Sequence, residues 1–134
     1  MTKIKVLFLC TGNSARSQMA EAFLRACAED RFEAYSDGLQ PKPIHPLTRQ
    51  VMGEIGFDLD GQRAKDVTEY LGKVHFGYLI TVCEDAERNG PKTFPGLGAR
   101  EHWALDDPAA FEGTEQARLS VFRQIRDEIQ KRVQ

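Results

Sequence analysis

A cysteine and an arginine lie six positions apart in a short polar loop near the start of the chain. The apolar run 4–9 ends at Cys10, and a polar segment through Arg16 precedes the first helix-forming residues. In an α/β protein this order puts the loop between the carboxyl end of a strand and the amino end of a helix. Backbone N–H groups there lack intrahelical partners, and the helix dipole adds positive charge. The loop is therefore predicted to bind an oxyanion, with Arg16 adding a planar guanidinium.

The same loop is expected to activate Cys10. A free thiol has a pKa of about 8.5, and helix N-termini and nearby cations lower it to about 3.5–7.5. Ser17 is expected to donate a hydrogen bond to the thiolate, Gly12 to let the backbone turn with its amides inward, and Asn13 to accept a left-handed conformation. The prediction is a nucleophilic thiolate facing a tetrahedral oxyanion. The alternative is a buried cysteine beside a surface arginine. The predicted anion-binding residues are Thr11, Gly12, Asn13, Ser14, Ala15 and Arg16.

Two later segments also follow predicted strands, namely the one at Cys83 and the turn Asp106-Asp107-Pro108. Carboxyl ends of parallel strands meet at one edge of a sheet, so both segments are expected to face the Cys10 loop. A leaving oxygen needs a proton, and we assign its donor as Asp107, with Asp106 as the second choice. The alternative for this turn is helix capping. Cys83 is predicted to attack a sulfur-bound intermediate on Cys10, the alternative being a small apolar residue that ends a strand.

Strands and helices alternate along the chain. Apolar or alternating runs predict strands at 4–9, 32–36, 76–82 and 101–105. Helical periodicity predicts helices at 18–29, 46–55, 66–71 and from 114 onward, and the Gly- and Pro-rich connection 84–98 is a candidate functional loop. This order predicts an α/β fold: one domain, 1–134, with a four-stranded parallel sheet flanked by helices on both faces.

Periodicity also assigns individual side chains to the core or to solvent. The stripes expected in the core are Met19, Phe23 and Cys27; Leu47, Val51 and Ile55; and Phe122, Ile125, Ile129 and Val133. Gly56 is the expected stop of the second helix. The charged face of the last helix is expected in solvent: Arg118, Arg123, Arg126, Asp127, Glu128 and Lys131.

Composition excludes several classes of function. The formal charge of −2 argues against nucleic acid and anionic membranes as partners. No apolar run is long enough to span a bilayer, and the first ten residues read as a strand and not as a signal peptide. Three cysteines without paired spacing favour a reducing cytoplasm. The histidines show no metal-ligand spacing: His45, His75 and His102.

The segment from Cys10 to Glu21, CTGNSARSQMAE, resembles the signature of the low-molecular-weight protein-tyrosine-phosphatase superfamily. Within that superfamily it is most similar to the thioredoxin-coupled arsenate reductases. The similarity covers essentially the whole chain, continuing at residues 35–38, 80–83, 101–103, 106–109 and 126–129. It implies a four-stranded parallel sheet flanked by helices, and no cofactor.

The resemblance also implies roles for the site residues. Cys10 attacks arsenate held by the loop amides and Arg16, while Asp107 matches the proton donor. Ser17 matches the residue that stabilises the thiolate, and Asn13 the one that shapes the loop. Cys83 matches the second redox cysteine, which attacks the arseno-cysteine, releases arsenite and leaves a Cys10–Cys83 disulfide.

The chain departs from these relatives at two places. Gly90 stands where thioredoxin-coupled reductases carry a third, shuttle cysteine. We therefore expect an outside reductant to resolve the disulfide: thioredoxin, glutaredoxin or a low-molecular-weight thiol. Some relatives hold a potassium ion through an acidic residue in the stretch that here reads Arg63-Ala64-Lys65, and Lys65 leads us to predict no metal.

Two other functions compete with arsenate reduction. The same loop, Arg16 and Asp107 suit a phosphatase acting through phosphocysteine. Against it, Cys83 would then be idle, and Ala109-Ala110 stands where family phosphatases tend to carry tyrosines that grip an aromatic substrate. The second competitor is a redox sensor or oxyanion-binding module without catalytic activity.

Overall fold

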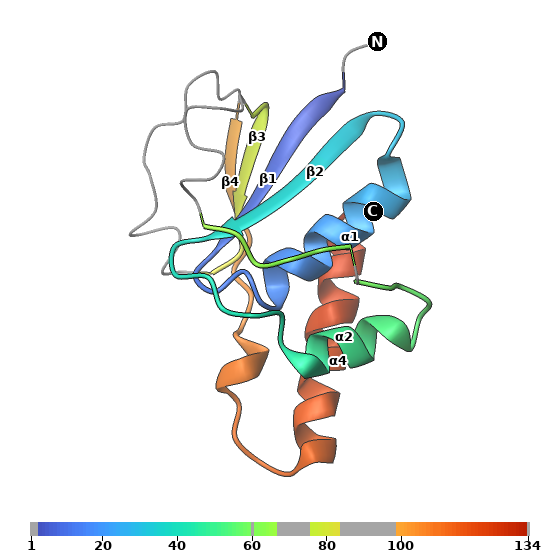
Figure 1. Cartoon of the computed structure of the whole chain (residues 1–134), viewed down its shortest axis with the longest axis vertical. Helices are drawn as coiled ribbons and strands as arrows, with labels where there is room; N and C mark the ends of the chain where they lie inside the picture. Colours follow the sequence, from blue (N-terminus) through green and yellow to red (C-terminus); the bar gives the residue numbers. More distant parts are fainter. Residues whose placement is uncertain (1–2, 60, 67–75, 84–98, 134) are drawn as a thin grey trace.

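A four-stranded parallel sheet forms the centre of the molecule (Figure 1). The computed structural model describes residues 3–59, 61–66, 76–83 and 99–133. The strands lie in the order β2-β1-β3-β4 and are all parallel, as the sequence predicted. Their bounds are β1 Ile4–Cys10, β2 Phe32–Gly38, β3 Tyr78–Thr81 and β4 Ala99–His102. The fourth strand begins and ends earlier than the predicted 101–105.

The strand register aligns the carboxyl ends of the strands. Cys10 pairs with Gly38 of β2, Leu9 pairs with Thr81 of β3, and Thr81 pairs with His102 of β4. The segments that follow β1, β3 and β4 therefore start from the same edge of the sheet. This register brings together residues that are more than 90 positions apart in the sequence, including Cys10 and Asp107.

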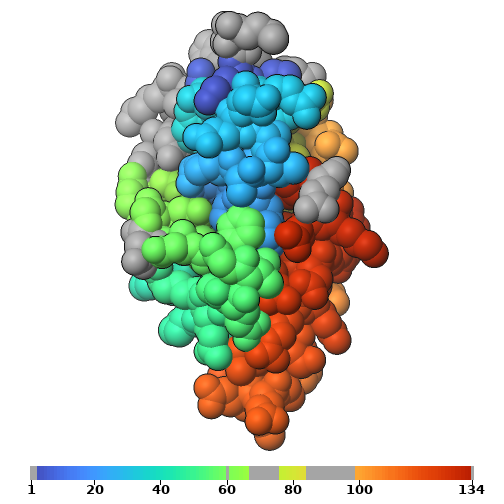
Figure 2. All heavy atoms as spheres, turned by 90° about the vertical axis from the view of Figure 1, so that its right-hand side faces the viewer, coloured from blue at the N-terminus to red at the C-terminus, as the bar shows by residue number. Residues whose placement is uncertain are grey.

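Three helices pack together on the sheet. Helix α1 (Arg16–Ala28) packs on β1 and β2, α4 (Glu115–Val133) packs on α1, and α2 (Pro46–Gly53) packs on α4. Figure 2 shows the outside of this layer, with α1 above and α2 and α4 side by side below it. A short 3-10 helix, η2 (Pro108–Ala110), precedes α4.

Both faces of β1 are covered, because the successive residues Leu7 and Phe8 point to opposite faces and both are buried. The connection 84–98 and nearly all of the helix predicted at 66–71 lie outside the described residues. Helices on both faces of the sheet therefore stay a prediction.

Most of the predicted core is buried, including Met19, Val51, Phe122 and Ile129 at 0% exposure. Gly56 has a φ of 88°, the left-handed conformation expected of a residue that ends a helix. Among the described residues, no helix is long and apolar enough to cross a membrane.

Three side-chain predictions are wrong. Cys27 is exposed, because it lies in the last turn of α1 in a shallow groove beside Phe57 and Val133. Ile55 is 38% exposed, because α2 ends at Gly53 and the chain turns away. Arg126, expected in solvent, is buried and donates hydrogen bonds to the Val51 carbonyl (2.9 Å) and to Glu54 (3.0 Å), which tie α4 to α2.

Candidate active site

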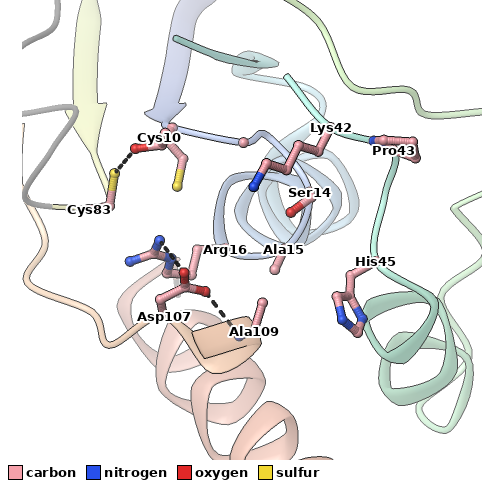
Figure 3. Close-up of a pocket in the computed structure, with 12 residues that line it drawn as sticks. Cys10, Ser14, Ala15, Arg16, Lys42, Pro43, His45, Cys83, Asp107 and Ala109 are labelled. Atoms are coloured by element: carbon pink, nitrogen blue, oxygen red, sulfur yellow. Dashed lines mark hydrogen bonds and ion pairs between the residues drawn. The ribbon is translucent and has the colours of Figure 1, made fainter. Parts of the chain in front are cut away.

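A pocket of about 560 Å³ opens at the carboxyl edge of the sheet (Figure 3). It brings together most of the residues predicted for the site: Cys10, Thr11, Gly12, Ser14, Ala15, Arg16, Cys83 and Asp107. The described lining also includes Lys42, Pro43, His45 and Ala109. Asn13, within the loop, and Ser17, directly after it, are fully buried and do not line the pocket. Of the two candidate acids, Asp107 and not Asp106 belongs to this lining.

The segment after β2 holds the carbonyl groups of the loop. Four N–H groups of this segment donate to four loop carbonyls at 2.8–3.1 Å: Leu39 to Cys10, Gln40 to Thr11, Lys42 to Gly12 and His45 to Ser14. In a trans peptide the N–H points away from the preceding carbonyl, so the amides that follow these carbonyls point to the other side, toward the pocket. Within the described part of the chain, the backbone amides from Gly12 to Arg16 donate to no backbone carbonyl. They are available to an anion.

Helix α1 adds positive charge to the loop. It begins at Arg16, two residues earlier than predicted. Its N-cap residue is Ala15, which has no side-chain acceptor to cap the first-turn amides. The first-turn amides therefore keep their capacity to bind an anion at the positive end of the helix dipole. This arrangement agrees with the prediction of an oxyanion loop.

A buried network of side-chain amides supports the loop from behind. Asn13 has a φ of 50°, so Asn13 and not Gly12 supplies the left-handed turn. Its Nδ2 donates to Ser17 Oγ at 2.8 Å, which leaves the Ser17 hydroxyl hydrogen free to donate elsewhere. Gln18 Nε2 in turn donates to Asn13 O and Oδ1, and Gln62 Nε2 donates to Gln18 Oε1 at 2.7 Å.

Sequence reasoning missed Gln18 and Gln62. Gln18 lies within the Cys10–Glu21 signature but was given no role, Gln62 lies in no motif, and periodicity registers apolar residues only. A polar residue directly after the loop is the only signal in the sequence, and it becomes meaningful only once the fold puts residue 62 beside it.

A lysine ammonium occupies the position beside the buried carboxylate of Glu21. Lys65 Nζ lies 3.4 Å from Glu21 Oε1 and donates to the Arg63 carbonyl at 2.9 Å. Both side chains are nearly inaccessible, at 7% and 4% exposure. Because this ammonium already neutralises Glu21, these residues do not fit a bound potassium ion. The described residues contain no cluster of three or more His, Cys, Asp or Glu side chains suited to a metal.

Arg16 and Asp107 meet at the floor of the pocket (Figure 3). Arg16 donates through NH1 to the Leu105 carbonyl at 2.9 Å, and its NH2 lies 3.8 Å from Asp107 Oδ2. The other oxygen of Asp107 accepts the Ala109 N–H at 3.0 Å and so caps η2. Asp107 thus caps a helix, as the alternative prediction held, while its half-exposed carboxylate also lines the pocket.

The two cysteine thiols lie close together. Cys10 and Cys83 are both buried and reduced, and Thr11 Oγ1 lies 3.4 Å from Cys83 Sγ. The neighbouring Cys83 thiol and the burial of Cys10 raise the pKa of Cys10 above its ordinary value, against Arg16 and the Thr11 amide, which lower it. The predicted lowering of this pKa is therefore wrong. That prediction considered the loop alone and not a second thiol beside it.

His45 lines one side of the pocket. Its Nδ1 accepts the Leu47 N–H at 3.1 Å and caps α2, and its ring packs on Phe122 with centroids 4.9 Å apart. Burial and the nearby Arg118 lower the pKa of His45, so its neutral form is favoured. The other described histidine, His102, lies at the sheet edge with Nδ1 2.8 Å from Thr81 Oγ1. His75 lies outside the described residues.

The sequence and the fold are both similar to those of known proteins. The family model for low molecular weight phosphotyrosine protein phosphatases matches residues 5–134. An arsenate reductase of Shouchella clausii is 41% identical over 134 residues, covering 99% of this chain and 94% of the relative. A solved structure of an arsenate reductase in the oxidized state has a TM-score of 0.81 at 30% identity, covering 96% of this chain and 92% of that one. A thioredoxin-dependent arsenate reductase of Corynebacterium glutamicum has a TM-score of 0.67 at 28% identity, covering 98% and 62%.

Proposed function

The chain belongs to the low molecular weight phosphotyrosine protein phosphatase family, and on that basis we propose that it is an arsenate reductase that converts arsenate to arsenite. One observation carries the choice of reaction within the family: Cys83, from the end of β3, lines the same pocket as Cys10. Hydrolysis through phosphocysteine needs one thiol and a water molecule, whereas a two-electron reduction by thiols needs two thiols. The arsenate reductases of similar sequence and fold support the same choice.

Binding of arsenate is the first step. The loop amides and the first turn of α1 receive the oxyanion, together with Arg16. Arg16 is already held by the Leu105 carbonyl, so its guanidinium is fixed in direction before the anion arrives. Fixed donors of this kind need little reorganisation during the reaction.

Nucleophilic attack follows. The Cys10 thiol gives its proton to an oxygen of the bound arsenate, and the resulting thiolate forms a bond to arsenic and displaces one oxygen, which leaves as water after it takes a proton from Asp107. Ser17, whose Oγ already accepts from Asn13, donates its hydroxyl hydrogen to the thiolate. The half-exposed position of Asp107 allows its carboxyl group to regain a proton from solvent.

Cys83 then completes the reduction. Its thiolate attacks Cys10 Sγ, the S–As bond breaks, and the electron pair of that bond stays on arsenic. Arsenic passes from the +5 to the +3 state and leaves as arsenite, while two thiols become one Cys10–Cys83 disulfide. The Thr11 hydroxyl, 3.4 Å from Cys83 Sγ, is placed to stabilise the attacking thiolate.

The disulfide must be reduced from outside the pocket. Cys27 does not suit the role of an internal shuttle, because it lies 11 residues after Arg16 on α1, roughly 16 Å along the helix. Gly90, at the position of the shuttle cysteine in relatives, lies outside the described residues. We therefore propose thioredoxin, glutaredoxin or a low-molecular-weight thiol as reductant, in a reducing compartment such as the cytoplasm.

A phosphatase is the second candidate, because the same loop, Arg16 and Asp107 suit a phosphoester and the family is named for that reaction. Ala109 lines the pocket beside Asp107, and no aromatic ring of a Phe, Tyr or Trp belongs to the described lining. Nothing among these residues grips an aromatic leaving group, which favours a small inorganic oxyanion.

Cysteine variants separate the two reactions. The assay follows arsenite release from arsenate with a dithiol as reductant, and separately the hydrolysis of para-nitrophenyl phosphate. For a reductase, Cys10→Ala and Cys83→Ala each abolish arsenite release, and the matched control Cys27→Ala retains it. If phosphoester hydrolysis is efficient, survives Cys83→Ala and is lost in Cys10→Ala, while no arsenite forms, the protein is a phosphatase instead.

A further inference from the structure

Lys42 is a charged residue in the pocket to which sequence reasoning gave no role. It lies in the segment after β2 and belongs to the pocket lining. Figure 3 shows its side chain running along the loop, with the ammonium nitrogen between the labelled side chains of Cys10 and Ser14. Arg16 and Asp107 lie on the other side of the pocket. The ion pairs between described residues do not include Lys42.

The backbone of Lys42 is held firmly in this place. Its N–H donates to the Gly12 carbonyl at 2.9 Å, so the residue is attached to the loop itself. Pro41 and Pro43 flank it, and each ring fixes its own φ while the residue before each proline is restricted to extended conformations. The side-chain stem also runs beside the loop, with Lys42 Cδ 4.0 Å from where a Gly12 Cβ would lie. The backbone that carries the Lys42 side chain is thus positioned beside the loop.

The positive charge of Arg16 is partly offset by its neighbours in the pocket. Arg16 is a cation at the bottom of the pocket. Its NH1 donates a hydrogen bond to the Leu105 carbonyl, and its NH2 faces the Asp107 carboxylate. A tetrahedral dianion arriving at the loop therefore meets one guanidinium whose charge is partly offset. An ammonium on the opposite side adds a charge-assisted contact to an oxygen that Arg16 does not reach.

From this geometry we infer that Lys42 is a substrate-binding residue, which captures the tetrahedral oxyanion from the side opposite Arg16. The inference rests on the proposed function, since the oxyanion is the arsenate of that reaction. Lys42 contacts outer oxygens of the anion and not the sulfur that attacks. It therefore acts on binding and capture, and its loss raises KM more than it lowers kcat.

The test removes or reverses this charge. Lys42→Gln keeps most of the length of the side chain, and Lys42→Glu reverses the charge; Lys131→Gln and Lys131→Glu, in the exposed last turn of α4, are the matched controls. Binding of inorganic phosphate is measured by calorimetry and by protection of Cys10 from iodoacetamide. We expect about 3- to 30-fold weaker phosphate binding in Lys42→Gln, a larger loss in Lys42→Glu and a shallower dependence on salt, whereas the Lys131 variants change less than about twofold.

Arsenate kinetics give a second readout, in which KM rises by a similar factor and kcat changes less than about twofold. Unchanged phosphate affinity in both Lys42 variants overturns the inference, and so does a fall in kcat at constant KM. Thermal melting of each variant checks that the fold is intact. If phosphate binding depends on Lys42 but the wild type releases no arsenite, the proposed function fails and the binding role stands. If arsenite forms and the Lys42 variants bind phosphate as well as wild type, only the binding role fails.

Discussion

Cys83 has two effects on Cys10 at the scale of single residues. The neighbouring Cys83 thiol and burial raise the pKa of Cys10, which favours its protonated form. In the proposed reaction Cys83 is also the second nucleophile. Placing the resolving thiol at the end of the adjacent strand therefore costs Cys10 some reactivity before substrate binds. Protonated thiols are also poor targets for oxidants, because oxidation requires the thiolate.

The effect of Cys83 on ionisation predicts a shift in reactivity. Because the neighbouring Cys83 thiol is the largest cause of the raised Cys10 pKa, Cys83→Ala is expected to lower that pKa. At a fixed neutral pH a larger fraction of Cys10 is then thiolate, and Cys10 reacts faster with iodoacetamide. The rate measured against pH gives the pKa directly, with Cys27→Ala as the control that leaves the pair intact. A Cys10 pKa in Cys83→Ala equal to that of the wild type, or higher, contradicts this account.

The assignment of the acid leads to a second prediction. Asp107→Asn removes a transferable proton while keeping the size of the side chain, so kcat for arsenate falls by about 10²- to 10⁴-fold. Binding of inorganic phosphate does not weaken, because the lost charge is negative. Asp106→Asn is the matched control, since Asp106 is exposed and outside the described lining, and it retains most of the activity. Equal losses in the two variants would show that the wrong carboxyl group has been assigned.

At the scale of elements, the close approach of β2 to the loop depends on Gly38. An added Cβ at Gly38 would lie 2.6 Å from the Thr11 carbonyl oxygen and 3.0 Å from the Asn13 amide nitrogen. Both atoms belong to the backbone of the anion loop and cannot move without distorting it. The strand end and the loop are therefore built against each other, and a glycine is required at their contact.

Gly38→Ala is accordingly expected to damage both stability and binding. We predict a loss of about 1–3 kcal/mol in the free energy of unfolding, from overpacking against the backbone. Phosphate affinity falls as well, because the loop amides are displaced. Gly53→Ala is the matched control, since nothing lies within 4 Å of its added Cβ and α2 tolerates alanine there. Denaturant unfolding and phosphate calorimetry measure the two effects, and a Gly38→Ala protein with wild-type values for both would disprove the contact.

The buried ion pair under the loop supplies another prediction. Lys65→Met removes a charge-assisted contact from buried Glu21, which keeps Arg25 at 2.7 Å and Ser36 at 2.6 Å as partners. We expect a loss of about 1–3 kcal/mol in the free energy of unfolding. Lys5→Met is the control: its pair with Glu33 is solvent-exposed, and about 0–1 kcal/mol is expected there. Urea unfolding of both variants decides, and equal losses would mean that burial gives the Lys65 pair no added value.

Elements with strong periodicity were predictable from the sequence, and their ends were not. The stripe of Phe122, Ile125 and Ile129 faces the core because every third or fourth residue of a helix shares a face. Cys27 follows the same spacing and is exposed, because periodicity within α1 does not show where α4, the helix that packs on it, ends. Arg126 looked like a surface charge and is buried, since its partners on α2 are more than 70 residues away in the sequence.

At the scale of the whole molecule, topology explains why the site could be predicted at all. Parallel strands bring the ends of β1, β3 and β4 to one edge, so Cys10, Cys83 and Asp107 were expected together and line one pocket. What could not be predicted are properties that arise from neighbours in space: the raised pKa of Cys10, the Gln18–Gln62 support and the direction of Lys42. Each depends on distances that only the folded chain defines.

The central claim is that two thiols of one oxyanion pocket reduce arsenate together, and mass mapping of thiols after one equivalent of arsenate tests it most directly. The reduced protein is mixed with arsenate without added reductant, quenched with an alkylating agent, digested and mapped. This account predicts one arsenite released per chain, a Cys10–Cys83 disulfide and an alkylated Cys27. Arsenite release with Cys10 linked to Cys27, or both pocket thiols still free after arsenate has been consumed, would contradict it.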